Sequence, residues 1–89
     1  MITRQELANA MLRSYKLKMG VVEKYKGSDD QCAYCDNKGQ VVFDQTTQTI
    51  ERYENGSAVA RVTVGAIEPA IVAMEEYATT GHLTAEICL

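Results

Sequence analysis

The dipeptide Asn55-Gly56 constrains the fold of this chain more than any other feature. It separates residues 48–54 from residues 57–64, and both runs are rich in residues that favour β-strands. Asn-Gly suits a two-residue type I′ turn, because both central positions need a positive φ. The dipeptide therefore predicts an antiparallel hairpin. Its inward face would hold three cross-strand pairs: Tyr53 with Ala58, Glu51 with Ala60, and Thr49 with Val62. Its outer face would hold Gln48, Ile50, Arg52, Val59, Arg61 and Thr63.

Two helices are predicted on either side of this hairpin. Thr3 and Glu6 match a capping box, which places a helix start there. Gly20 costs about 1 kcal/mol inside a helix, so this first helix ends or kinks there. The second helix opens at Glu68-Pro69, where proline loses no hydrogen bond, and it ends at Gly81. The apolar residues of the first helix recur at helical spacing: Leu7, Met11, Tyr15, Met19 and Val22.

The remaining segments complete the expected architecture. Residues 27–40 contain turn-forming residues and a cysteine pair, and we interpret them as a loop. Residues 41–45 form a short strand candidate, and residues 83–89 alternate with the period of a half-buried strand. The order α-β-β-β-α-β predicts a single α+β domain over residues 1–89, with an antiparallel sheet covered by helices on one face.

The charges divide unevenly along the chain. Residues 1–26 carry six basic and two acidic residues, a balance of +4, whereas residues 27–89 carry three basic and ten acidic residues, a balance of −7. This asymmetry favours a partner of opposite charge, or attraction between the two halves within the fold. No apolar run is long enough to span a membrane, and residues 1–6 lack a secretory pattern. We therefore expect a cytoplasmic protein with no membrane partner.

Cys32 and Cys35 are spaced like a pair of metal ligands. With Gly39 they resemble half of a zinc knuckle or zinc ribbon, and this resemblance implies zinc as a cofactor. His82 and Cys88 would have to complete the site, although their spacing is longer than usual. The alternative is that Cys32 is a small buried hydrophobe. Disulfide exchange is disfavoured, because the neighbouring carboxylates Asp29, Asp30 and Asp36 raise the pKa of a thiol.

Catalytic motifs are missing from the sequence. There is one histidine, no glycine-rich phosphate loop and no HExxH. Glu75 and Glu76 are adjacent on a helix, so they point about 100° apart. We expect a protein that is not an enzyme.

Recognition of another protein is the function class that remains. Tyr34 cannot be placed in the core by its pattern, and exposed tyrosine is favoured at interfaces. In length, acidity and lack of catalytic motifs, the chain is similar to small accessory proteins of phages and mobile elements. These include inhibitors of host nucleases such as anti-CRISPR proteins. The expected partner-binding residues are acidic, apart from the tyrosine: Asp29, Asp30, Tyr34, Asp36, Asp44, Glu51 and Glu54.

Two further hypotheses stay open at the level of sequence. One is a zinc-stabilised binding module that uses the cysteine pair. The other is a nucleic-acid binder that uses Arg13 and Lys16 on the basic first helix, which the overall acidity of the chain opposes. Association into a homo-oligomer is compatible with the sequence.

Overall fold

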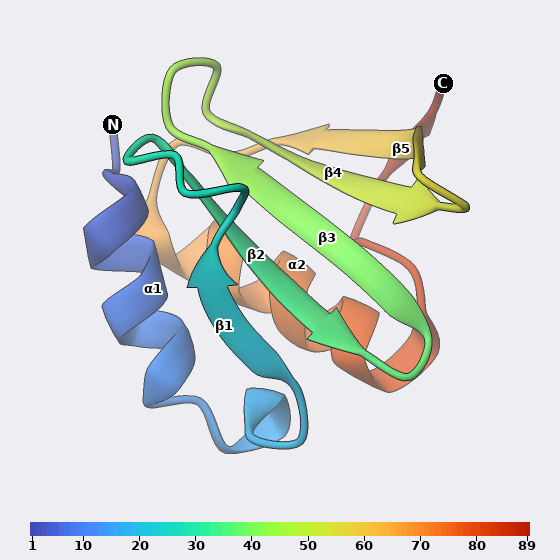
Figure 1. Cartoon of the computed structure of the whole chain (residues 1–89), viewed down its shortest axis with the longest axis horizontal. Coiled ribbons are helices and arrows are strands. Elements are labelled where there is room, and N and C mark those ends of the chain that lie inside the picture. Colours follow the sequence, from blue (N-terminus) through green and yellow to red (C-terminus); the bar gives the residue numbers. More distant parts are fainter.

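The sheet is a six-stranded antiparallel meander, in which each strand pairs with the one before it (Figure 1). The computed structural model describes all residues from Met1 to Leu89. The helices are α1 (Arg4–Leu12), the short 3-10 helix η1 (Tyr15–Leu17) and α2 (Ile67–Thr80). The strands are β1 (Val21–Lys24), β2 (Gln31–Asp36), β3 (Gly39–Asp44), β4 (Thr49–Glu54), β5 (Ser57–Thr63) and β6 (Ile87–Cys88). The predicted α+β class, with an antiparallel sheet and the helices packed against it, is confirmed.

The predicted hairpin is β4–β5, and its register changes one residue beyond the turn. Asn55 and Gly56 have φ values of 52° and 81°, and Tyr53 pairs with Ala58 as predicted. Arg52 then pairs with Ala60, which leaves Val59 as the extra residue of a β-bulge.

The bulge overturns the predicted faces of β4. Ala60 and Val62 point inward as expected, but they pair with Arg52 and Ile50 rather than with Glu51 and Thr49. Glu51 instead pairs with Arg61 on the outer face, and Thr49 pairs with Thr63. The predicted outer positions of Ile50 and Arg52 are therefore wrong, because one inserted residue reverses the alternation on the partner strand.

Gln48 is also buried rather than on the outer face. Its side-chain carbonyl accepts from the backbone N–H of Ile2 at 3.0 Å, and its side-chain amide donates to the carbonyl oxygen of Ile2 at 2.8 Å. These two bonds tie the N-terminus to the turn between β3 and β4.

Helix α1 is shorter than its apolar pattern predicts. Its capping box forms, with Thr3 Oγ1 accepting from the N–H of Glu6 and the Glu6 carboxylate accepting from the N–H of Thr3. The helix ends at Leu12, so Tyr15 and Met19 leave the buried stripe and are exposed, while Leu17 of η1 is buried in their place. The end of α2 agrees with the sequence, since Gly81 caps it with a φ of 85°.

Residues 27–40 are not a loop, because they include β2 and the turn into β3. Cys32 and Tyr34 point from β2 into the core, so the expected exposure of Tyr34 is wrong. At the other end of the chain only Ile87 and Cys88 form a strand. The predicted alternation is broken at Ala85, which adopts a positive φ of 56°.

One hydrophobic core lies between the inner face of the sheet and the helices. In Figure 1, α2 crosses behind the sheet and α1 flanks it beside β1. Tyr34 of β2 and Tyr77 of α2 meet edge to face, with ring centroids 6.3 Å apart. The hydroxyl of Tyr77 is buried and has no hydrogen-bond partner. The Tyr34 ring also lies directly against the backbone of Gly20.

Substitution of Gly20 by alanine tests this contact. A Cβ at position 20 would lie 2.4 Å from the Tyr34 ring, so Gly20→Ala should lower the free energy of unfolding by about 1–3 kcal/mol, as overpacking does. Gly65→Ala is the matched control, because a Cβ at position 65 would meet nothing within 4 Å. Urea unfolding measures both. Equal stability of the two variants would contradict the packing seen at Tyr34.

Candidate functional site

The four predicted metal ligands do not come together in the fold. Cys32 and Cys35 lie on β2, where side chains three positions apart point to opposite faces of the sheet. Cys32 is in the core, whereas Cys35 accepts a hydrogen bond from the side-chain amide of Gln40 on β3 at 3.3 Å. Cys88 lies on β6, and His82 follows α2. No three His, Cys, Asp or Glu side chains are grouped so that they could hold a metal ion.

The thiols should therefore react at very different rates. Burial raises the pKa of the Cys32 thiol to about 11, whereas Cys88 is exposed. Because the thiolate is the reactive form, iodoacetamide should modify Cys88 first and leave Cys32 unmodified until the protein unfolds. Peptide mass spectrometry after timed alkylation checks this order. Rapid modification of Cys32 in the native protein would show that β2 does not bury it.

His82 belongs to a polar cluster centred on Glu86. The Glu86 carboxylate accepts two hydrogen bonds from the Arg52 guanidinium, at 3.0 and 2.8 Å, and one from the N–H of Leu83 at 2.7 Å. The His82 Nδ1 atom lies 3.1 Å from the same carboxylate. These contacts hold the C-terminal segment against β4. The hydrogen bonds from Arg52, before any other cause, lower the pKa of Glu86 to about 2.

The low pKa of Glu86 predicts how stability depends on pH. The folded pKa of Glu86 lies below the ordinary value of 4.5. The stability that the ionised carboxylate contributes is therefore complete above pH 4.5 and is lost as the pH falls toward 2. At pH 7, Glu86→Gln should destabilise the fold by about 1.5–3 kcal/mol, the range for hydrogen bonds to charged groups. Between pH 5 and pH 2, the free energy of unfolding should fall by a smaller amount in the variant than in the wild type.

Urea unfolding at a series of pH values measures this difference. Glu76→Gln is the control, because Glu76 is exposed on α2 and its carboxylate makes no hydrogen bond or ion pair. If Glu86→Gln and the wild type lose stability in parallel below pH 5, the pKa of Glu86 is not depressed.

The predicted acidic residues fall into two groups at opposite ends of the strands. Asp29, Asp30 and Asp44 lie where β1 turns into β2 and where β3 ends, whereas Asp36 and Glu54 lie at the turns that follow β2 and β4. Glu51 lies between these groups on the outer face. Most of these carboxylates have partners within the chain: Asp29 with Lys24, Asp36 with Lys38, Glu51 with Arg61, and Glu54 with Arg52. Only the carboxylate of Asp30 makes neither a hydrogen bond nor an ion pair.

The outer face of the sheet carries two tyrosines that meet across it. Tyr25 follows β1 and Tyr53 lies on β4, yet their ring centroids are 6.1 Å apart. Strands β2 and β3 lie between them, and each step between strands is about 4.8 Å, so the rings extend over these two strands. Ala33 and Val42 point outward, because they lie in one cross-strand row between Glu23 and Glu51. They are nevertheless only 0% and 3% exposed. The tyrosine pair therefore covers the middle of this face.

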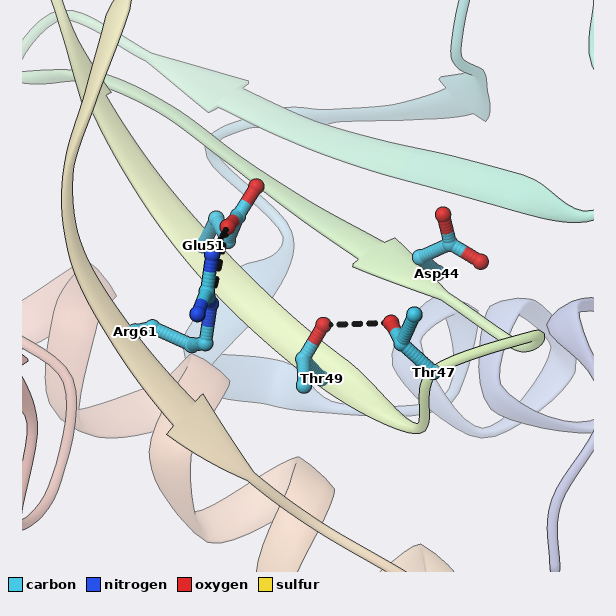
Figure 2. Close-up of a pocket in the computed structure, with 5 residues that line it drawn as sticks. All are labelled: Asp44, Thr47, Thr49, Glu51 and Arg61. Carbon is cyan, nitrogen blue, oxygen red and sulfur yellow. Dashed lines mark hydrogen bonds and ion pairs between the residues drawn. The ribbon is translucent and has the colours of Figure 1, made fainter.

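A polar hollow of about 260 Å³ lies on the same face (Figure 2). The Arg61 guanidinium donates twice to Glu51 Oε2, at 2.9 and 2.6 Å, and the phenol of Tyr53 donates to Glu51 Oε1 at 3.4 Å. The hydroxyls of Thr47 and Thr49 are 2.7 Å apart. The hollow is lined by Asp44, Thr47, Thr49, Glu51 and Arg61. It has two carboxylates for one guanidinium, so it favours a cationic group.

Comparison of the chain with known protein families, curated proteins and solved structures gave no match. No helix has the length and apolar content that crossing a membrane requires. The function therefore has to be inferred from the surface. Asp44 and Glu51 of the predicted set contribute to the outer face, whereas Tyr34 does not. The pairing of Tyr25 with Tyr53 had no signal in the sequence, because it depends on strand order.

Proposed function

We propose that this chain is a protein-recognition module, without catalytic activity, that binds its partner through the outer face of the sheet. The observation that carries this proposal is the Tyr25–Tyr53 pair, which lies beside the Glu51–Arg61 hollow on the face that no helix covers. Tyrosine combines a large rigid contact area with a hydroxyl, and it is enriched among residues that dominate binding energy.

The chemistry of the hollow favours a protein partner over a small molecule. Small-molecule pockets are mostly apolar, but no apolar side chain lines this hollow. A tyrosine pair bordered by charged and hydroxyl side chains instead has the composition of a protein interface, with an aromatic centre and a polar rim.

The charges favour a basic partner. Glu23, Asp44 and Glu51 all point outward from the sheet. Two cations lie with them, Arg61 paired with Glu51 and Lys26 with its Nζ atom 5.2 Å from the centre of the Tyr25 ring, so one negative charge is in excess. A surface that normally binds nucleic acid has the complementary positive charge. We therefore propose a cytoplasmic inhibitor that occupies the nucleic-acid site of another protein, such as a host nuclease. This is the mode that its similarity in size and charge to anti-CRISPR proteins implies.

Affinity capture from a lysate of the source cells, with the chain immobilised, tests the proposal. The captured partner is then purified and titrated against three variants. Tyr53→Ala and Glu51→Lys should each weaken binding about tenfold or more, as interface residues do. Raising the salt concentration should weaken the wild-type complex, because charge complementarity is screened.

Glu76→Lys is the matched control, because it makes the same charge change on the exposed side of α2. It should bind like the wild type. Urea unfolding of every variant separates lost binding from lost folding. The proposal fails if Glu76→Lys weakens binding as much as Glu51→Lys, or if neither sheet variant affects it.

A further inference from the structure

A second surface, on the helical side of the molecule, combines exposed apolar residues with unpaired cations. Leu12, Tyr15 and Met19 are 70%, 77% and 85% exposed, and they lie between the end of α1 and the start of β1. Arg13, Lys16 and Lys18 alternate with them in the sequence. None of the three cations forms an ion pair, and Lys18 Nζ lies 3.8 Å above the centre of the Tyr15 ring. We call these six residues the basic–apolar patch.

The patch continues into a cleft of about 510 Å³ between η1 and the turn that joins β2 to β3. Lys16 and Met19 line one side of this cleft, and Lys38 lines the other. Tyr34 and Asp36 also contact it, and both are largely buried, so they form its floor. The close approach of the Tyr34 ring to Gly20 holds that floor in place.

The mouth of the cleft is positive although the whole chain is acidic. Asp36 is paired with Lys38, with an Oδ2 to Nζ distance of 3.0 Å, and Lys16 forms no ion pair. Arg13 and Lys18 of the adjoining patch add to the positive charge of Lys16. One carboxylate of α2 reaches the patch, that of Glu75, which accepts a hydrogen bond from Ser14 Oγ at 2.6 Å. Exposed methionine and tyrosine surface surrounded by cations is complementary to a segment that presents both apolar and acidic side chains.

We propose that this cleft and patch bind an acidic, amphipathic segment of a second protein partner. An apolar side chain of the segment would enter the cleft between Met19 and Tyr34. Its carboxylates would pair with Lys16 and the neighbouring cations. The cleft shares no lining residue with the Glu51–Arg61 hollow and has the opposite charge, so the chain would join a basic partner to an acidic one.

Three other occupants fit the observations less well. A second copy placed around a two-fold axis would set Arg13, Lys16 and Lys18 against their own symmetry mates, which is repulsive. A bilayer presents a broad surface that cannot fill a cleft. A nucleic acid would need an aromatic face for base stacking, but Lys18 already covers the Tyr15 ring.

Fluorescence anisotropy with a labelled amphipathic helical peptide of Leu, Ala and Glu tests the inference. Two further peptides replace every Glu by Gln or every Leu by Ser. The wild-type chain should bind the parent peptide, and each replacement should weaken binding about tenfold, since the site needs both charge and apolar surface. Phosphatidylserine-containing vesicles and an oligothymidylate are tested in parallel.

Two variants locate the binding on the chain. Lys16→Glu and Met19→Ser should each weaken peptide binding about five- to tenfold. Lys26→Glu makes the same charge change, and Val72→Ser replaces another exposed apolar residue by serine, both outside the cleft; both should stay within about twofold of the wild type. Glu51→Lys should also leave peptide binding unchanged, which separates this site from the sheet face.

The inference is overturned if the parent peptide does not bind, or if Lys26→Glu weakens it as much as Lys16→Glu. It is also overturned if vesicles or the oligothymidylate bind more tightly than the peptide and lose that binding in Lys16→Glu.

Discussion

The β-bulge at Val59 determines which side chains of the β4–β5 hairpin lie opposite one another on each face of the sheet. Because β5 has one extra residue, its inward-facing Ala60 and Val62 lie opposite Arg52 and Ile50, while Glu51 and Tyr53 point outward. The carbonyl oxygen of Val59 accepts a hydrogen bond from the N–H of Leu89 at 3.0 Å. The bulge therefore anchors the C-terminus as well as aiming the side chains of the candidate interface.

Burying the charged side chain of Arg52 costs free energy, and the C-terminal segment offsets this cost. A buried guanidinium without partners would be strongly destabilising. Here Glu86 binds it through both carboxylate oxygens, and Glu54 binds it from the end of the same strand at 2.6 Å. The segment after α2 is thus held mainly by charge-assisted hydrogen bonds, because β6 contributes only two residues to the sheet.

Local chemistry explains which parts of the fold could be predicted from the sequence. The Asn55-Gly56 turn, the capping box at Thr3 and the glycine cap at Gly81 depend on a few adjacent residues, and all three form as predicted. The faces of β4 could not be predicted, because nothing near Val59 in the sequence signals an inserted residue. On β5, inward and outward side chains alternate regularly on either side of the bulge, but the order reverses across it.

The candidate sites show the same division between local and long-range information. The spacing of Cys32 and Cys35 suits a metal only in a turn, and pairing with β1 and β3 makes this segment a strand. Glu51 and Asp44 could be named from composition, but their partners could not. The contact between Tyr25 and Tyr53 depends on the complete strand order, and so does the cleft between η1 and the turn after β2.

The meander has a consequence for how the chain folds. Strands β1 to β5 each pair with the next strand along the chain, so this part of the sheet can grow by successive hairpins without closing a long loop. Strand β6 pairs with β5 only after α2. Helix α2, which covers the inner face, follows five of the six strands along the chain. During synthesis, the inner apolar face of the sheet therefore emerges before α2 can shield it. Until then α1 and the short η1 are the only helices available to cover it, and this interval is when the nascent chain is most exposed to aggregation or chaperone capture.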